Sequence, residues 1–323
     1  MKKRSKKLSF VQTRVWVKQS PPLEQSPCGH WLLAWIQDHQ GKRVALSIYL
    51  DCAGFEVHAT TWGDARLPAL LMWHGLARTG RDFDTIASAL SHRWHVICPD
   101  QIGRGLSQWS QTPDQDYAFA RYGEIATALA DQLAPGRFLW LGTSMGGALG
   151  LRMAAGPLRD RIRALVVNDI GPSLPAPALA RIRAYAGTPP DFATMGDFEA
   201  FVREAYRPFG AHSDAQWRHM AETTARRLPN GRITPHYDPA IVRQFDLHPD
   251  DYEFWDRYDT IATPLLVLHG LDSDLLLPET AAAMATRGPH ARIAEISGCG
   301  HAPGLNTAAQ IAVVESFLDQ YAS

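Results

Sequence analysis

Lysine is absent from most of this chain. All six lysines of the 323 residues lie at or before Lys42. Residues 1–42 consequently carry eight basic and two acidic side chains, whereas residues 43–323 carry 24 and 31. A basic arm on an acidic body is typical of a solvated extension. We therefore expect residues 1–43 to be a basic, poorly ordered N-terminal extension, with contact to nucleic acid or a membrane as the less favoured alternative.

Cysteine and long apolar runs are also scarce. The four cysteines show neither paired spacing nor a Cys-x-x-Cys motif, which favours free thiols in a reducing compartment. No apolar run approaches the roughly 20 residues of a membrane span. Polar residues between Gln12 and Gln19 interrupt the stretch where a signal peptide needs apolar residues. We expect a cytoplasmic protein with no membrane span, no nucleic-acid partner and, because no His or Cys pair has ligand spacing, no metal site.

Short apolar segments alternate with helical periodicity from residue 44 onward. Residues 44–50 and 55–62 alternate like antiparallel strands joined by a turn. Apolar runs typical of buried strands cover residues 69–73, 94–98, 138–141, 162–167, 264–269 and 291–296. Helical periodicity covers residues 82–90, 117–133 and 308–321. This alternation predicts an α/β fold with a mostly parallel sheet covered by helices on both faces.

The alternation lapses between residues 172 and 261. This stretch is rich in arginine and aromatic residues, has helical character and contains no convincing strand. We expect residues 44–171 and 262–323 to form the α/β core, and residues 172–261 to be a helical cap or lid inserted into it.

Ser144 lies in the most informative motif of the chain. The segment Gly142-Thr143-Ser144-Met145-Gly146-Gly147 directly follows a predicted strand and opens a predicted helix. On such a tight corner the serine hydroxyl projects from the sheet edge, where a base can reach it. Glycines two residues before and after the serine, Gly142 and Gly146, avoid collisions between the strand and the helix. The pattern predicts Ser144 as a nucleophile.

A candidate acid and then a candidate base follow Ser144 along the chain, so the order is Ser, Asp, His. His301 comes after Gly298 and Gly300 at the end of the last predicted strand, and we expect it to be the base. Because the carboxyl ends of parallel strands share one edge, these residues should converge.

Three aspartates are candidates for the acid. Asp274 is preferred, since it lies four residues before Pro278, which begins the next helix. Asp272 shares the same turn. Asp169 is the third candidate. It follows the predicted strand at residues 162–167, and a parallel α/β sheet of this kind can also supply the acid from that position.

Two backbone N–H groups are predicted to form an oxyanion hole. The N–H of Met145 follows from the strand-to-helix corner. The second should come from the loop after the third strand, with Leu76 favoured. We expect the nearby His74 to shape this loop rather than to act chemically.

Together these residues resemble the α/β-hydrolase superfamily, over roughly residues 44–321. The segment from Asp100 to Ser107 adds a further landmark, after the fourth strand. The resemblance implies an eight-stranded sheet, a helical cap, no cofactor, His301 as base and an acid from the turn at residues 272–274. One departure stands out: members often place the acid three residues after the glycine that corresponds to Gly270, where this chain has Ser273.

The nucleophile narrows the function. Dehalogenases and epoxide hydrolases of this fold use an aspartate nucleophile at the strand-to-helix corner, which is called the elbow. This chain has Ser144 there, which argues against both classes. Many carbon–carbon bond hydrolases carry Asn before the nucleophile, where this chain has Thr143. We expect a serine hydrolase that cleaves a carboxylic ester or lactone of a small molecule. The alternatives are a carbon–carbon bond hydrolase or perhydrolase, a non-hydrolytic ligand receptor, and an interaction module acting through the lysine-rich arm; the oligomeric state is left open.

Overall fold

The computed structural model describes residues 45–322. The predicted N-terminal extension over residues 1–43 therefore lies outside the described residues.

An eight-stranded sheet runs through the described part of the chain in the order β1-β2-β4-β3-β5-β6-β9-β10. β2 is antiparallel to both of its neighbours, and all other neighbouring strands are parallel. The strands are β1 (Leu46–Cys52), β2 (Phe55–Trp62), β3 (Ala69–Trp73), β4 (His95–Pro99), β5 (Phe138–Thr143), β6 (Ile162–Asn168), β9 (Leu265–Gly270) and β10 (Arg292–Ile296). The predicted mostly parallel, eight-stranded sheet is confirmed.

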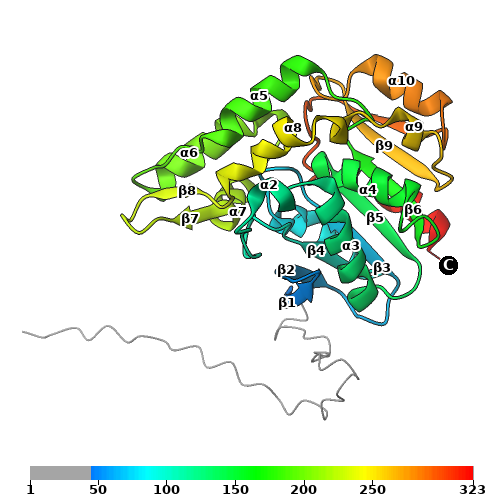
Figure 1. Cartoon of the computed structure of the whole chain (residues 1–323), viewed down its shortest axis with the longest axis horizontal. Helices are drawn as coiled ribbons and strands as arrows, with labels where there is room; N and C mark the ends of the chain where they lie inside the picture. Colours follow the sequence, from blue (N-terminus) through cyan, green and yellow to red (C-terminus); the bar gives the residue numbers. More distant parts are fainter. Residues whose placement is uncertain (1–44, 323) are drawn as a thin grey trace, which may run out of the picture. The chain divides into compact units, whose positions relative to one another are not determined.

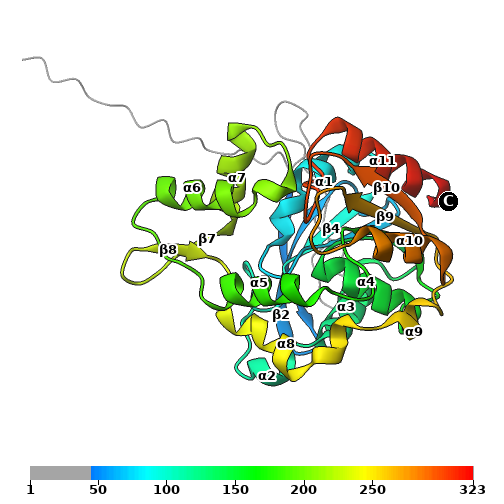
Figure 2. The ribbon, with the colours of Figure 1, turned by 90° about the horizontal axis from the view of Figure 1, so that it is seen from above.

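Helices cover both faces of this sheet (Figures 1 and 2). Helices α1 and α11 pack on one face, and α3 and α4 on the other. The core helices are η1 (Gly80–Phe83), α1 (Asp84–Leu90), α2 (Pro113–Asp116), α3 (Phe119–Leu133), α4 (Met145–Ala155), α10 (Pro278–Thr286), α11 (Ala308–Leu318) and η5 (Asp319–Tyr321). None of the helices in the described part of the chain has the length and apolar content that a membrane crossing requires.

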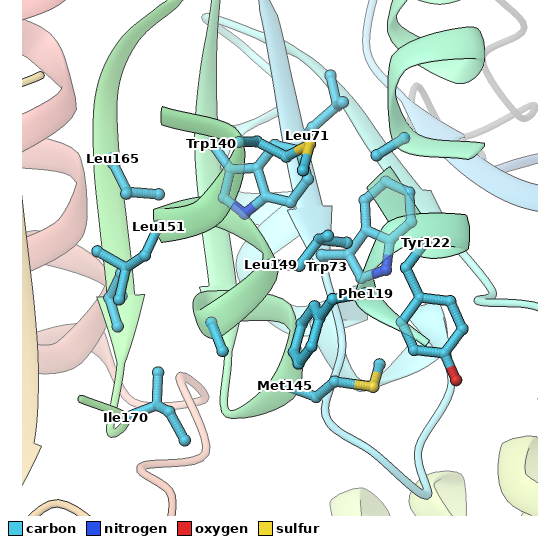
Figure 3. Packing of buried hydrophobic residues seen from close by; sticks show 14 of the residues in the cluster. Leu71, Trp73, Phe119, Tyr122, Trp140, Met145, Leu149, Leu151, Leu165 and Ile170 are labelled. Carbon is cyan, nitrogen blue, oxygen red and sulfur yellow. The ribbon is translucent and has the colours of Figure 1, made fainter. Parts of the chain in front are cut away.

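Successive residues of β3 point into two separate hydrophobic layers. Leu71 and Trp73 lie in the layer under α3 and α4, whereas Leu70 and Met72 lie in the layer under α1 and α11. Trp73 stacks on Trp140 of β5 with ring centroids 5.2 Å apart. Figure 3 shows this pair beside α4, with Met145 at the start of the helix. Strand β5 and helix α4 are therefore anchored by large buried rings.

The segment between β6 and β9 is largely helical. It contains α5 (Ala176–Gly187), α6 (Met195–Ala205), η2 (Arg207–Phe209), α7 (Asp214–Thr224), β7 (Ala225–Arg227), β8 (Ile233–Pro235), η3 (Pro239–Arg243), α8 (Gln244–Leu247), η4 (Pro249–Tyr252) and α9 (Trp255–Tyr258). The antiparallel pair β7 and β8 contradicts the expectation of no strand here. Three-residue strands reading Ala-Arg-Arg and Ile-Thr-Pro carry too few alternating apolar residues to predict.

This inserted segment has a small core of its own and is tied to the sheet-bearing part. A separate hydrophobic cluster contains Phe198, Val202, Trp217, Met220, Ala221 and Ile233. The loop after β4 pairs with the chain after β8, because the Gly105 N–H donates to His236 O (2.9 Å) and the Asp238 N–H donates to Gly103 O (2.7 Å). These bonds hold the insertion against the loop that follows β4.

Candidate active site

Ser144 occupies a strained corner between β5 and α4. Its φ and ψ are 52° and −120°, a positive-φ conformation that is rare for a residue with a side chain. A Cβ on Gly142 would lie 2.1 Å from the carbonyl oxygen of Gly146, and one on Gly146 would lie 2.0 Å from that of Trp73. Both positions therefore require glycine, for the reason the motif suggested.

The structure brings Ser144 and His301 together. Ser144 Oγ lies 2.9 Å from His301 Nε2, and His301 Nδ1 lies 2.8 Å from Asp169 Oδ2. Asp169 is fully buried, and 14% of the His301 side chain is exposed. The three side chains come from the ends of β5, β6 and the loop after β10, which meet at one sheet edge.

Two donors fix the Asp169 carboxylate. The Gly270 N–H donates to Oδ1 (2.8 Å), and the Ser273 hydroxyl donates to Oδ2 (2.5 Å). Both donors come from the end of β9 and the turn that follows it. The carboxylate is therefore held at a defined angle to the imidazole of His301.

The preferred acid, Asp274, is not at this site. Its side chain is 58% exposed and forms an ion pair with Arg181 at 2.8 Å. Asp272 is also exposed, and its N–H bonds to the carbonyl of Cys299. The turn after β9 carries both aspartates to the surface and turns only Ser273 inward.

The sequence did contain the signal for this correction. The acid is missing from the position of Ser273, and Asp169 stands at the end of the neighbouring strand β6. The spacing to Pro278 favoured Asp274 instead. That spacing indicates where the next helix begins, but it does not determine which side chains of the preceding turn point inward.

The N–H groups of Leu76 and Met145 are both available beside Ser144. Among the hydrogen bonds between described residues, neither N–H has an acceptor. Met145 is the first residue of α4, so its N–H lies at the positive end of the helix. A Cβ on Gly75, the residue before Leu76, would lie only 3.5 Å from Ser144 Cβ. The loop after β3 therefore packs directly against the elbow.

His74 shapes this loop through backbone contacts. Its Nδ1 lies 2.7 Å from the Gly75 carbonyl oxygen, and its Nε2 accepts the N–H of Gln101 (2.9 Å). Burial lowers the pKa of His74 to about 4, so the ring is neutral with its proton on Nδ1. In a trans peptide the N–H points opposite to the C=O. Holding the Gly75 carbonyl therefore directs the Leu76 N–H to the other side.

A cavity of about 570 Å³ lies between residues of α1 and α7. Thr143, which precedes Ser144, and Pro303 and Gly304, which follow His301 in the sequence, line part of it, whereas Ser144, His301 and Asp169 themselves do not. Its size lies within the range of small-molecule sites, about 300–1,000 Å³.

Other reactive groups of residues 45–322 do not form a second centre. Cys52, Cys98 and Cys299 are buried free thiols. Burial raises the pKa of each, that of Cys52 to about 12. These residues also contain no group of three or more His, Cys, Asp or Glu side chains that could hold a metal ion.

Comparison with known proteins gives consistent relatives. The sequence model described as the alpha/beta hydrolase family matches residues 70–314. A 3-hydroxybutyrate-oligomer hydrolase of Cupriavidus necator is 37% identical over 266 residues, which cover 79% of this chain and 90% of the relative. An esterase of Mycobacterium tuberculosis is 27% identical over 248 residues, covering 75% of this chain and 80% of the relative.

Solved structures agree with this assignment. An alpha/beta hydrolase from Novosphingobium aromaticivorans aligns with a TM-score of 0.74 at 32% identity, covering 85% of this chain and 98% of that chain. A putative hydrolase from Rickettsia typhi aligns with a TM-score of 0.77 at 26% identity, covering 86% and 99%. The chain therefore belongs to the alpha/beta hydrolase family, as an ester-hydrolysing enzyme.

Proposed function

We propose that this enzyme cleaves the ester bonds of short 3-hydroxybutyrate oligomers, with Ser144 as nucleophile, His301 as general base and Asp169 as the orienting acid. The observation that carries the chemistry is the continuous hydrogen-bonded series from Ser144 Oγ through the His301 ring to Asp169 Oδ2. The substrate class rests on the relative of Cupriavidus necator, which shares 37% identity over 90% of its length.

Acylation begins when His301 Nε2 takes the proton from Ser144 Oγ as the oxygen attacks the ester carbonyl carbon. The carbonyl oxygen becomes an oxyanion and accepts hydrogen bonds from the N–H groups of Leu76 and Met145. Collapse of the tetrahedral intermediate breaks the bond to the alcohol oxygen, which receives the proton from His301. Water then attacks the acyl-enzyme with His301 again as base, releasing the acid and restoring the Ser144 hydroxyl.

Asp169 acts through His301. A carboxylate on Nδ1 keeps the proton at that nitrogen, so that Nε2 faces Ser144 with a lone pair. It also stabilises the imidazolium that forms when Ser144 loses its proton. Burial of Asp169, with Gly270 and Ser273 as further donors, keeps this orientation fixed.

An oligoester needs room on both sides of the bond that is cut, since each unit is an acid at one end and an alcohol at the other. The cavity lined by Thr143, Pro303 and Gly304 offers space within a few residues of Ser144 and His301 in the sequence. Phe83, Phe209 and Met220 add apolar surface to it. This surface suits the methyl-bearing backbone of a 3-hydroxybutyrate chain.

The arginines of the insertion are poorly suited to bind the terminal carboxylate of a 3-hydroxybutyrate oligomer. Four of them pair with acidic side chains on the surface: Arg181, Arg183, Arg203 and Arg207. Exposed pairs of this kind compete with a substrate carboxylate.

The test compares purified wild type with Ser144→Ala on the linear trimer of 3-hydroxybutyrate. Release of monomer and dimer is followed by chromatography, with p-nitrophenyl butyrate and γ-butyrolactone as reference substrates. We expect the wild type to cleave the trimer and the variant to have no activity on any ester. Cleavage of p-nitrophenyl butyrate with no cleavage of the trimer would leave an ester hydrolase but refute the oligomer as its substrate.

A further inference from the structure

Arg104 is a buried cation next to the oxyanion loop. It belongs to the loop after β4, and none of its surface is exposed to solvent. Among the described residues, no carboxylate forms an ion pair with it within 4.0 Å, although 15 other arginines of the same region make such pairs. Burial of a charge without a partner charge is costly. The unpaired guanidinium of Arg104 therefore lowers the stability of the fold.

The guanidinium of Arg104 contacts both residues of the proposed oxyanion hole. Its Nε donates to the carbonyl oxygen of Leu76 (2.8 Å), and its Nη2 lies 3.5 Å from Met145 Sδ. Its Nη1 donates to the Ile102 carbonyl (2.7 Å) and to the Tyr122 hydroxyl (3.0 Å). Figure 3 shows Met145 and Tyr122 side by side in this region. Every nitrogen of the group is thus directed to a defined neighbour.

Aromatic rings complete the surroundings of this cation. The Arg104 Cζ lies 5.3 Å from the ring centroid of Tyr122 and 5.6 Å from that of Tyr117. Rings and carbonyl oxygens solvate a guanidinium without cancelling its charge. A positive charge in such a poorly solvated place acts over a longer range than one in water.

We propose that Arg104 is a positioning residue of the oxyanion hole, which holds Leu76 in place through its carbonyl oxygen and adds a fixed positive charge near the two residues that supply the N–H donors. This inference rests on the proposed function of Ser144, Leu76 and Met145. The ester carbonyl is neutral in the bound substrate and becomes an oxyanion only in the transition state. The charge therefore stabilises the transition state more than the bound ester, and its removal lowers kcat rather than raising KM.

The test uses three substitutions that separate the charge of Arg104 from its shape. Arg104→Lys keeps the positive charge. Arg104→Gln keeps a hydrogen-bond donor but not the charge, and Arg104→Met keeps neither the charge nor a donor. Each variant is assayed for kcat and KM with p-nitrophenyl butyrate. Each is also titrated with an alkylboronic acid, which forms a tetrahedral anionic adduct with a nucleophilic serine and so reports on the oxyanion site.

We expect Arg104→Gln and Arg104→Met to lower kcat about 10- to 100-fold with little change in KM, because one oxyanion-hole donor is itself worth about 100-fold or more. The boronate Ki should rise by a similar factor. Arg104→Lys should retain most of both properties. Arg152→Met is the matched control, since Arg152 also packs on two rings, those of Phe119 and Phe254, but does not contact Leu76 or Met145. It should lower the melting temperature without changing kcat or the boronate Ki.

Wild-type values of kcat and Ki in folded Arg104→Gln or Arg104→Met would overturn the proposal. Equal losses in Arg104→Lys and Arg104→Gln would overturn the part played by the charge. If Arg104→Met does not fold, the comparison of the Lys and Gln variants decides the matter. A wild-type enzyme that neither turns over an ester nor binds the boronate would instead refute the proposed function.

Discussion

The Ser273 hydroxyl donates a 2.5 Å hydrogen bond to Asp169 Oδ2, the same oxygen that lies 2.8 Å from His301 Nδ1. The position at which α/β hydrolases often carry their acid thus holds a serine, and this serine binds an aspartate from the neighbouring strand β6. Relative to that common arrangement, the carboxylate lies at the end of β6 instead of in the turn after β9.

Asp169→Asn should lower kcat by about 10³- to 10⁴-fold with KM nearly unchanged, because an amide cannot keep the proton on His301 Nδ1. Asp272→Asn and Asp274→Asn are the controls and should stay within about threefold of wild type, since both side chains are exposed. Steady-state kinetics on p-nitrophenyl butyrate measure all three. A large loss in Asp274→Asn together with a small one in Asp169→Asn would restore the acid that the sequence favoured.

The double variant D169S/S273D should recover part of the activity that Asp169→Asn loses. Ser273 is within 2.5 Å of an oxygen that contacts the imidazole, so a carboxylate placed there can reach His301 Nδ1. We expect kcat to rise about tenfold or more above Asp169→Asn, since an orienting carboxylate is worth several orders of magnitude when ideally placed. The matched control D169S/S273N has the same shape without the charge. Equal rates in the two double variants would argue against acid relocation.

The stability of the enzyme should decrease on acidification because of His74. Burial lowers its pKa from 6.5 to about 4, so the unfolded chain binds this proton more readily than the folded one. Stability from neutral His74 is fully present above about pH 6.5 and is lost as pH falls toward 4, by about 3 kcal/mol over that interval.

The variant His74→Gln isolates this contribution, because burial also lowers the pKa of other histidines, among them the buried His95 and the partly buried His236. Urea unfolding at pH 7.5 and pH 4.5 should show a smaller loss of stability for His74→Gln than for wild type. A loss of the same size in both proteins would show that His74 does not titrate in this way.

Ala215→Phe should discriminate between short and long substrates. Ala215 lines the cavity from α7, and its side chain is exposed. A phenyl group there reduces the volume of this cavity without replacing a buried core residue. We expect kcat/KM for the 3-hydroxybutyrate trimer to fall about tenfold, a cost of about 1.4 kcal/mol, while p-nitrophenyl acetate is little affected. Ala215→Ser controls for the loss of the alanine. Equal losses of kcat/KM on both substrates would show that this cavity does not bind the oligomer.

The sequence predicted the sheet and the elbow because local rules determine both. Alternating apolar strands and helices indicate a covered parallel sheet, and the glycines around Ser144 have steric causes within a few residues. The acid depended instead on how the turn after β9 twists, which spacing to Pro278 does not determine. The role of Arg104 was equally hidden, because its neighbours Leu76 and Met145 come from distant parts of the chain.

The most direct test of the account is intact-protein mass spectrometry after treatment with a fluorophosphonate, followed by peptide mapping. We predict one equivalent of label on Ser144 in the wild type, none at this site in Ser144→Ala, and much slower labelling in His301→Ala, whose serine lacks a base. Folded wild-type protein that takes up no label, or takes it up at another residue, would contradict the central claim that Ser144 is an activated nucleophile.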